Sequence, residues 1–311
     1  MKPSFILLHA ENLNANKDSV CNLILVPVID GVRQEPKVFL VDPHSDYDMV
    51  MSGITREQIE EAPDFETLWP EIRQLLEDAP FVVCSADGNS VTTLAGTVSR
   101  LGLTCPEIPY INAKAICRRT MDHFSYNLQI LADHYFQKTI SYLEPVDIAE
   151  TWADLVIIGL ESAKEDSFVA FAKSHRIQLG MFSSEEFHPC RSLKLYQWDK
   201  DKLFDPSSVA VDADPDHPFY GANIVFTGKL ESMTRDEARS AVVAIGGNAP
   251  ERLTMETNIL VVGNQDLRVV GEKGMSGKMK TAAKYKEKGC NIEVIDESDF
   301  IEQLGQKNHK K

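Results

Sequence analysis

The sequence has no long apolar run, no paired cysteine motif and no excess of basic charge. No stretch approaches the roughly 18 consecutive apolar residues of a membrane span. The first residues also lack the apolar core and cleavage site of a signal peptide. Six cysteines are scattered without a C-x-x-C pair, which argues against a zinc ribbon or disulfide framework. We therefore expect a cytoplasmic protein with no membrane partner.

The acidic charge is unevenly distributed along the chain. The formal net charge of −15 argues against a protein that coats nucleic acid nonspecifically. Residues 218–311 carry 14 Lys and Arg against 13 Asp and Glu, which leaves 18 against 34 in residues 1–217. At 311 residues the chain is long enough for two domains. We expect two different modules.

The first two thirds of the chain alternate predicted strands with predicted helices. Asp30-Gly31 predicts a hairpin turn, and Thr55 with Gln58 forms a capping-box pattern. Strands are predicted at 5–8, 22–29, 37–41 and 81–86, and helices within 53–78 and at 90–101, 126–135 and 146–161. This pattern predicts an α/β domain over residues 1–161 with a mixed sheet. Residues 162–217 are less regular and are predicted to be a connector and linker.

The end of the first predicted strand carries the first chemical signal. His9, Ala10 and Glu11 follow the apolar residues 5–8. Hydrolysis of a phosphodiester with two Mg²⁺ needs several carboxylates that converge on the ions. An acidic pair at i and i+2 would place both side chains on one face of the strand. Here only the second position is acidic.

The segments GITREQIEEAPDFETLWPEI (53–72) and YNLQILA (126–132) resemble those of DnaQ-like (DEDD-type) 3′→5′ exonucleases. The resemblance covers about residues 4–161 and implies an RNase H-like mixed-sheet fold with Mg²⁺ or Mn²⁺ as cofactor. The metal carboxylates of the family are depleted here, because only Glu11 and Asp147 remain as catalytic and metal-binding candidates. His9, Asn89 (or Ser90, with Asp87 nearby) and Tyr142 stand at the degenerate positions. Halving the charge of the site weakens Mg²⁺ binding, so we expect an inactive exonuclease domain.

The last module combines residues that suit an anion. Thr227 and Gly228 follow a predicted strand, Arg235 lies in the first turn of the next helix, and Lys278 opens a basic helix. Helix N-termini favour anions. From these residues alone, a plain turn and a solvated lysine face remain the better explanation. The β-α-β-β-α-β-α pattern predicts a small three-layer α/β domain over residues 218–311.

The segments VFTGKLESMTRDEA, IGG, TNILVVG and SGKMKTAAKYKEKGCNIEVIDESDF resemble a BRCT domain of the subtype found in NAD-dependent DNA ligases and the clamp-loader large subunit. The resemblance implies that Thr227, Gly228, Arg235 and Lys278 form a pocket for a 5′-phosphate. Phe300 departs from the tryptophan that many BRCT domains carry in the last helix.

Three hypotheses follow for function. The first is a protein of DNA replication or repair, associated with a bacterial nucleoid, that binds DNA ends or nicks through a 5′-phosphate. In it the exonuclease fold is inactive, and Lys114, Arg118 and Arg119 are either a DNA-contacting patch or a solvated surface. The second is an active exonuclease with an altered metal site of Glu11, Asp147 and Asp87 or His9. The third is a scaffold whose BRCT domain binds a phosphoprotein or a replication or repair partner.

Overall fold

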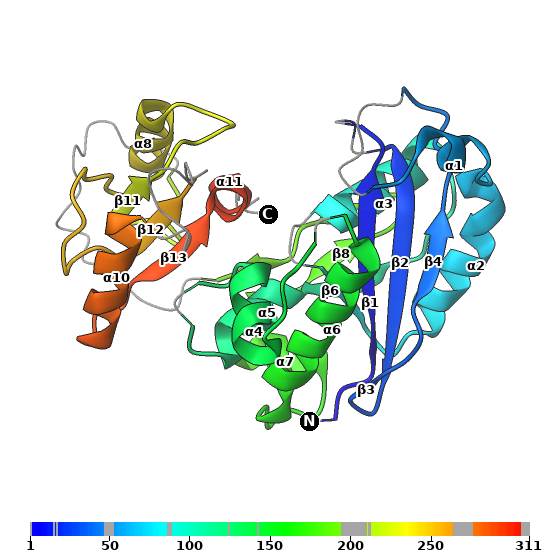
Figure 1. Cartoon of the computed structure of the whole chain (residues 1–311), viewed down its shortest axis with the longest axis horizontal. Coiled ribbons are helices and arrows are strands. Elements are labelled where there is room, and N and C mark those ends of the chain that lie inside the picture. Colours follow the sequence, from blue (N-terminus) through cyan, green and yellow to red (C-terminus); the bar gives the residue numbers. More distant parts are fainter. Residues whose placement is uncertain are drawn as a thin grey trace. The chain divides into compact units, whose positions relative to one another are not determined.

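The computed structural model describes residues 2–14, 16, 18–46, 53–85, 89–123, 125–141, 143–193, 210, 213–263 and 276–305. The chain divides into two compact units (Figure 1). The first unit comprises Met1–Met121 and Leu128–Arg191, and the second comprises Asp122–Asn127 and Ser192–Lys311. Within the described residues, no helix combines the length and apolar character needed to cross a membrane. All six cysteines are free thiols.

A mixed sheet forms the centre of the first unit. Its strand order is β3-β2-β1-β5-β6-β8-β9, with β4 also paired to β2. The β1–β2, β2–β3, β2–β4, β6–β8 and β8–β9 pairs are antiparallel, whereas β5 lies parallel to both β1 and β6. The strands are β1 Phe5–Asn12, β2 Val20–Ile29, β3 Val32–Arg33, β4 Lys37–Leu40, β5 Val82–Cys84, β6 Ile108–Asn112, β8 Gly180–Phe182 and β9 Phe187–His188. The predicted mixed α/β fold is confirmed.

Local sequence signals fix several of these elements. The turn between β2 and β3 has Asp30 at φ 51° and Gly31 at φ 77°, the left-handed pair that a tight hairpin requires. The capping box at the start of α1 is also present, because Thr55 and Gln58 each accept the backbone N–H of the other. Both features confirm the sequence prediction.

Helices cover the central strands of the first unit. Nearly all residues of β1 and β2 are buried, which requires cover on both faces of the sheet. Helices α3 and α6 both pack against β1 and β2, and Figure 1 draws α6 beside β1. The helices of this unit are α1 Arg56–Glu60, α2 Phe65–Asp78, α3 Asn89–Arg100, α4 Ala113–Thr120, α5 Leu128–Phe136, α6 Pro145–Glu161 and α7 Phe168–Ser174.

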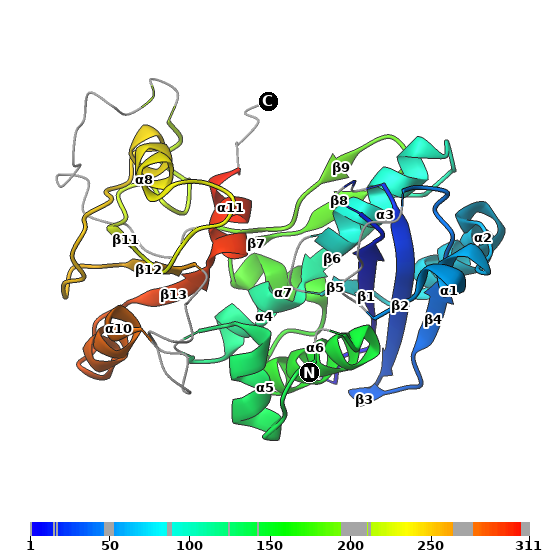
Figure 2. The same ribbon diagram turned by 45° about the horizontal axis from the view of Figure 1, so that its top comes forward.

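Two sequence predictions on the first unit are corrected. Strand β1 does not end at residue 8 but continues to Asn12, because β2 is long enough to pair with it throughout. Residues 162–193 are not an irregular connector: they form α7 and the strands β7 Ile177–Gln178, β8, β9 and β10 Arg191–Ser192. Figure 2 shows β8 and β9 extending the sheet beyond β6. Residues 194–209, 211 and 212 of the predicted connector and linker lie outside the described residues.

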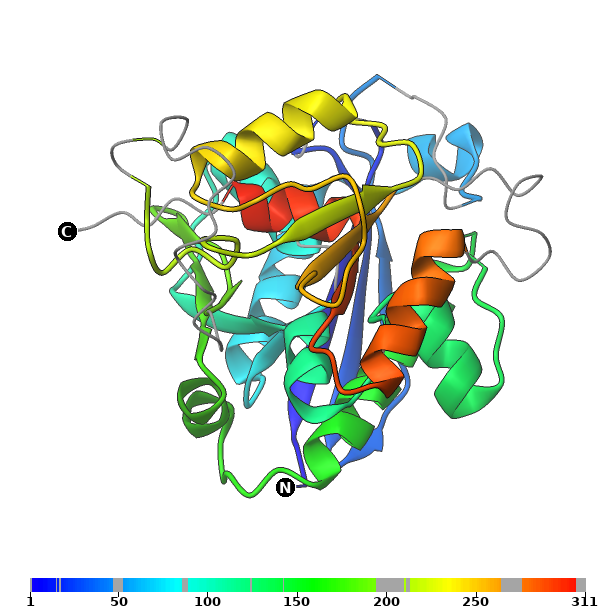
Figure 3. The same cartoon turned by 90° about the vertical axis from the view of Figure 1, so that its left-hand side faces the viewer.

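The second unit has three layers around a parallel sheet of β11 Ile224–Thr227, β12 Ile259–Val262 and β13 Glu293–Asp296. Helices α8 Arg235–Ala244 and α11 Glu297–Leu304 share one apolar core with the sheet. Helix α10 Gly277–Glu287 closes a second core against alternate strand residues. Figures 1 and 3 show α8 and α10 on opposite sides of the strands. A further pairing, between Asn223 and Asn248, is a single bridge.

Phe300 is the residue at which the BRCT resemblance would lead us to expect tryptophan. It belongs to α11 and is fully buried in the core that this helix and α8 form with the sheet. Its ring stacks on Phe219 with centroids 5.6 Å apart and meets Phe226 edge-on at 5.1 Å. The smaller aromatic side chain therefore serves as the anchor of the last helix.

Candidate functional sites

A hydroxyl–hydroxyl contact links the end of β11 to the start of α10. Thr227 closes the strand and is buried, and its Oγ1 lies 3.2 Å from the Oγ of Ser276. Ser276 is the N-cap of α10 and accepts the backbone N–H of Met279. Gly228 follows Thr227 at φ 77°, a conformation that disfavours any side chain. Gly228 therefore allows the chain to turn sharply beside the N-terminus of α10.

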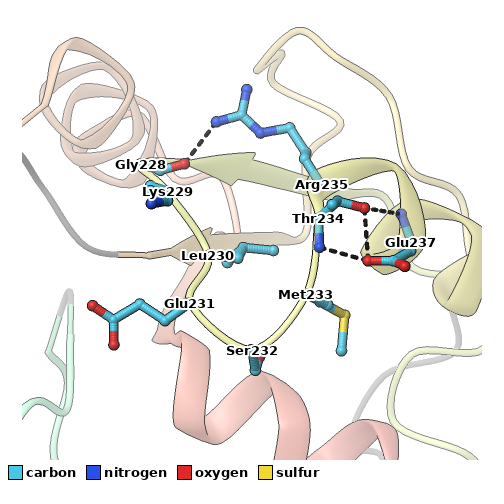
Figure 4. A pocket seen from close by; sticks show the side chains of 9 residues that line it. All are labelled: Gly228, Lys229, Leu230, Glu231, Ser232, Met233, Thr234, Arg235 and Glu237. Carbon is cyan, nitrogen blue, oxygen red and sulfur yellow. Dashed lines mark hydrogen bonds between the residues drawn. The ribbon is translucent and has the colours of Figure 1, made fainter.

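Helix α8 places Arg235 above the same strand end. Its start is a capping box, because the Thr234 hydroxyl accepts the Glu237 N–H at 3.2 Å and the Glu237 carboxylate accepts the Thr234 N–H at 2.7 Å. Arg235 comes next, and its Nη2 donates to the carbonyl oxygen of Gly228 at 2.7 Å (Figure 4). A guanidinium group is thus fixed at the N-terminal end of this helix.

Lys278 approaches from α10. Its Nζ donates to the carbonyl oxygens of Phe226 and Glu251, each at 2.9 Å. Burial lowers the pKa of Lys278, the nearby Arg235 and Arg239 charges lower it further, and Glu251 opposes them. The ammonium group is therefore held beside two other cations, an arrangement that a bound anion would relieve.

A pocket of about 280 Å³ gathers these cations. It is lined by Phe226, Arg235, Arg239, Pro250, Glu251 and Lys278. The Arg239 guanidinium donates to the Ala249 carbonyl at 3.0 Å and pairs with the Glu251 carboxylate at 3.3 Å. Three cations face one carboxylate, so the lining carries a net positive charge. The sequence analysis missed Arg239, although its position four residues after Arg235 places both on one helix face.

The other two predicted phosphate-binding residues lie differently. Gly228 lines a second, more open pocket of about 780 Å³, formed by residues 228–235 and Glu237. Arg235 lines both pockets, and Figure 4 shows its side chain reaching back over Gly228. Thr227 lines neither pocket and directs its hydroxyl to Ser276. Arg235 and Lys278 are thus brought together directly, and Gly228 and Thr227 support the strand end beneath them.

A carboxylate of the protein already occupies the loop between β11 and α8. Glu297, the first residue of α11, accepts the backbone N–H groups of Glu231 and Ser232 at 2.8–2.9 Å and the Ser232 hydroxyl at 2.5 Å. Burial alone would raise the pKa of Glu297, but these hydrogen bonds outweigh it and lower the pKa. An external anion is therefore better accommodated in the small cationic pocket than in this loop.

In the first unit, neutral hydroxyl groups surround the end of β1. His9 is buried, and its Nδ1 lies 2.9 Å from the Oγ of Ser85. Ser85 Oγ in turn lies 2.9 Å from Ser90 Oγ, which accepts the backbone N–H of Ala10 at 3.0 Å. Serine therefore stands at 90, one of the two positions at which the exonuclease resemblance would place an aspartate.

The two remaining carboxylates are each engaged by another side chain. Glu11 Oε2 accepts from the Asn22 amide at 3.1 Å. Asp147, in the first turn of α6, forms an ion pair with Lys138, whose Nζ also donates to the Thr151 hydroxyl at 3.0 Å. Lys138 thus supplies a positive charge to the carboxylate that the resemblance assigns to a metal.

These residues do not fit a two-metal centre. Mg²⁺ and Mn²⁺ prefer several carboxylate oxygens, and neutral hydroxyls with one ion-paired aspartate are a poor substitute. Among the described residues, no group of three or more His, Cys, Asp or Glu is placed to bind a metal ion. Asp87, Tyr142 and the side chain of Asn89 lie outside the described part of the chain.

The basic patch predicted on the first unit is corrected at one position. Lys114, in the first turn of α4, is only 6% exposed. Arg118 and Arg119, at the other end of this helix, are partly exposed. Lys114 therefore cannot contribute to a surface that meets nucleic acid, because its side chain belongs to the interior.

Comparison with known proteins identifies the second unit. Residues 214–304 match the family model of the BRCA1 C Terminus (BRCT) domain. A DNA ligase of Erythrobacter litoralis is 37% identical over 87 residues, which are 28% of this chain and 10% of the ligase. A DNA ligase of Halalkalibacterium halodurans is 30% identical over 99 residues, 32% of this chain and 13% of that ligase. The chain thus spans about a tenth of the length of these curated relatives.

A solved structure is similar to a larger part of the chain. The structure described as "Exonuclease X in complex with 5′ overhanging duplex DNA" aligns with a TM-score of 0.42 and 16% identity, over 54% of this chain and 97% of that one. The BRCT resemblance seen in the sequence is confirmed, with its start four residues before the expected position 218.

Proposed function

We propose that this protein binds DNA ends or nicks that carry a 5′-phosphate, and that the terminal phosphate enters the pocket of Arg235, Arg239 and Lys278. The observation that carries the proposal is the convergence of three cationic side chains on one pocket of about 280 Å³. The lowered pKa of Lys278 is consistent with a cationic site built for an anion.

A terminal phosphate suits this pocket better than the phosphodiester backbone. A monoester carries a charge of about −1.5 to −2 near neutral pH and has three strong acceptor oxygens. Both Arg235 and Lys278 lie in the first turn of a helix, where the backbone dipoles also favour negative charge. The larger pocket that shares Arg235 leaves room beside the phosphate for the adjoining nucleotide.

DNA is favoured over a phosphoprotein by the relatives of this domain. The curated relatives that match the second unit are named DNA ligases, which supports DNA as the ligand of this domain. The same chemistry would recognise a phosphorylated side chain, so a phosphopeptide is included as a competitor in the test below.

We further propose that the first unit does not hydrolyse DNA. Support comes from the pairing of Asp147 with Lys138 and from the hydroxyl group at Ser90. Two-metal hydrolysis needs carboxylates that bind both ions and a base for the attacking water. This unit would then serve as a folded platform for the end-binding domain.

Fluorescence anisotropy with a matched pair of duplexes tests the proposal. The duplexes differ only in a 5′-phosphate, and EDTA is present. We expect tighter binding of the phosphorylated duplex. Arg235→Gln should weaken that binding by about 10- to 150-fold, because charge-assisted hydrogen bonds are worth about 1.5–3 kcal/mol. The control is Lys173→Gln, which removes the same single positive charge from an exposed residue of α7.

Three results would contradict the proposal. Equal affinity of the wild-type protein for both duplexes would exclude recognition of the 5′-phosphate. Displacement of the duplex by a phosphopeptide at a lower concentration than by an unlabelled phosphorylated duplex would favour the phosphoprotein scaffold. Shortening of a labelled strand from its 3′ end in Mg²⁺ or Mn²⁺ would show that the exonuclease chemistry survives.

A further inference from the structure

Helix α10 carries a row of lysines on its outward surface. Met279 and Ala282 pack into the core against the sheet, so the opposite side of the helix faces solvent. Lys280, Lys284 and Lys288 are all exposed. Lys280 and Lys284 belong to the helix, and Lys288 is its C-cap residue. The spacing of four residues places them on one side of the helix, with successive lysines about 6 Å apart.

The row stands apart from the other lysines of this helix. Lys278 points to the carbonyl oxygens of Phe226 and Glu251 in the cationic pocket. Lys286 is engaged by the Asp122 carboxylate at 3.1 Å and by the His123 carbonyl. Glu287 is the one exposed carboxylate on the described helix. The helix therefore separates a phosphate-pocket lysine at its start from three solvent-facing lysines along its length.

We propose that Lys280, Lys284 and Lys288 bind the sugar-phosphate backbone of the same DNA duplex whose 5′-phosphate occupies the pocket; this inference rests on the proposed function. The row begins two residues after Lys278 and extends about 12 Å along the helix axis. At about 3.4 Å per nucleotide of one strand, this length covers three to four base pairs next to the end.

Charge complementarity favours DNA as the occupant of this surface. Residues 1–217 carry 34 acidic against 18 basic residues, so most of the chain repels a polyanion. The basic row offers the duplex an attractive surface on the solvent side of the same helix that supplies Lys278 to the pocket. It also binds every sequence alike, because phosphate contacts carry no base information.

The salt dependence of binding measures the row separately from the pocket. We compare the wild-type protein with the triple variant Lys280→Gln, Lys284→Gln and Lys288→Gln, since glutamine has nearly the helix propensity of lysine. The slope of log K against log salt is negative, and each lost phosphate contact reduces its magnitude by about 0.9. The magnitude of the slope should therefore be about 2–3 smaller in the triple variant than in the wild-type protein. The triple variant should also bind both duplexes at least about tenfold more weakly near 0.1 M salt.

Two further variants sharpen the test. The charge-matched control is Lys37→Gln, Lys164→Gln and Lys173→Gln, three exposed lysines of the first unit, and it should keep the wild-type slope. Glu287→Gln should act in the opposite direction and tighten both duplexes. Thermal unfolding of each variant verifies that the fold is retained.

The outcomes of the two proposals are distinguishable. If the triple variant keeps the wild-type slope and affinities, the lysine row does not contact DNA, whatever the preference for phosphate. If the triple variant weakens both duplexes equally while the wild-type protein shows no preference for the 5′-phosphate, the row is supported and the proposed function fails. If the wild-type protein binds neither duplex, both proposals are wrong.

Discussion

Replacing Lys278 with glutamine separates ligand binding from folding. The pKa of Lys278 is lowered in the folded protein by burial and by Arg235 and Arg239. At neutral pH the lysine is charged in both the folded and unfolded states, so the repulsion is present in full. It is relieved only as the pH rises through the folded pKa, where the unfolded chain binds more protons. A neutral glutamine removes this repulsion at every pH.

The two effects of Lys278→Gln on stability oppose each other. The hydrogen bonds to the Phe226 and Glu251 carbonyls are each worth about 1 kcal/mol. Their loss is offset by the relief of repulsion, and the amide group can donate to one of the same carbonyls. We therefore expect the free energy of unfolding to change by no more than about 1 kcal/mol.

The same substitution should weaken binding of the phosphorylated duplex only. A charge-assisted hydrogen bond to the phosphate is worth about 1.5–3 kcal/mol, which corresponds to a loss of about 10- to 150-fold for the phosphorylated duplex. The unphosphorylated duplex leaves the pocket empty, so its affinity should be unchanged. Lys278→Arg retains the charge and should retain most of the preference.

Urea unfolding and anisotropy on the same preparation provide the two measurements. The reasoning is refuted if Lys278→Gln remains folded and keeps its full preference for the phosphorylated duplex. It is also refuted if this variant loses several kcal/mol of stability and binds both duplexes equally weakly, because Lys278 would then be a structural residue.

Three other predictions concern metal and pH. Adding Mn²⁺ to the metal-free protein should leave Tm unchanged, because Asp147 pairs with Lys138; a metal present at 100 times its Kd would add about 2.7 kcal/mol and raise Tm by several degrees. The pKa of Glu297 is lowered in the fold, so its contribution of about 1 kcal/mol is present above pH 5 and disappears as the pH falls through that pKa. Urea titrations of Glu297→Gln and wild-type protein should therefore differ at pH 7 and converge in acid. Affinity for the phosphorylated duplex should fall at alkaline pH as Lys278 loses its proton. An affinity that does not change between neutral pH and pH 11 would contradict this prediction.

The second unit was predicted well from sequence because its signals are local. The Thr227-Gly228 turn, the helix starts at residues 234 and 276 and the alternating apolar strands each depend on residues close in the chain. Arg235 and Lys278 were assigned to one site only through the BRCT resemblance, because the residues alone favoured a plain turn and a solvated lysine face. Arg239 was missed because a second arginine one turn along a helix also fits an ordinary solvated surface.

The parts that sequence did not predict depend on contacts between distant residues. Strand β8 is three residues long, and it belongs to the sheet only because β6 lies beside it. The pairing of Glu297 with the loop at Ser232 joins residues 65 apart in the chain. Lys138 and Asp147 are nine positions apart with no periodic relation, so nothing in the sequence identifies this lysine as the partner of a candidate metal ligand.

The most direct test of the account is the ³¹P NMR resonance of the terminal phosphate in a duplex bound to the intact protein. This monoester signal is separate from those of the diester backbone. Cations around the phosphate favour its dianion, so we predict that its second pKa, about 6 in solution, falls on binding to the wild-type protein and returns in Arg235→Gln. A bound duplex whose terminal phosphate keeps the chemical shift and titration of free DNA would contradict the account.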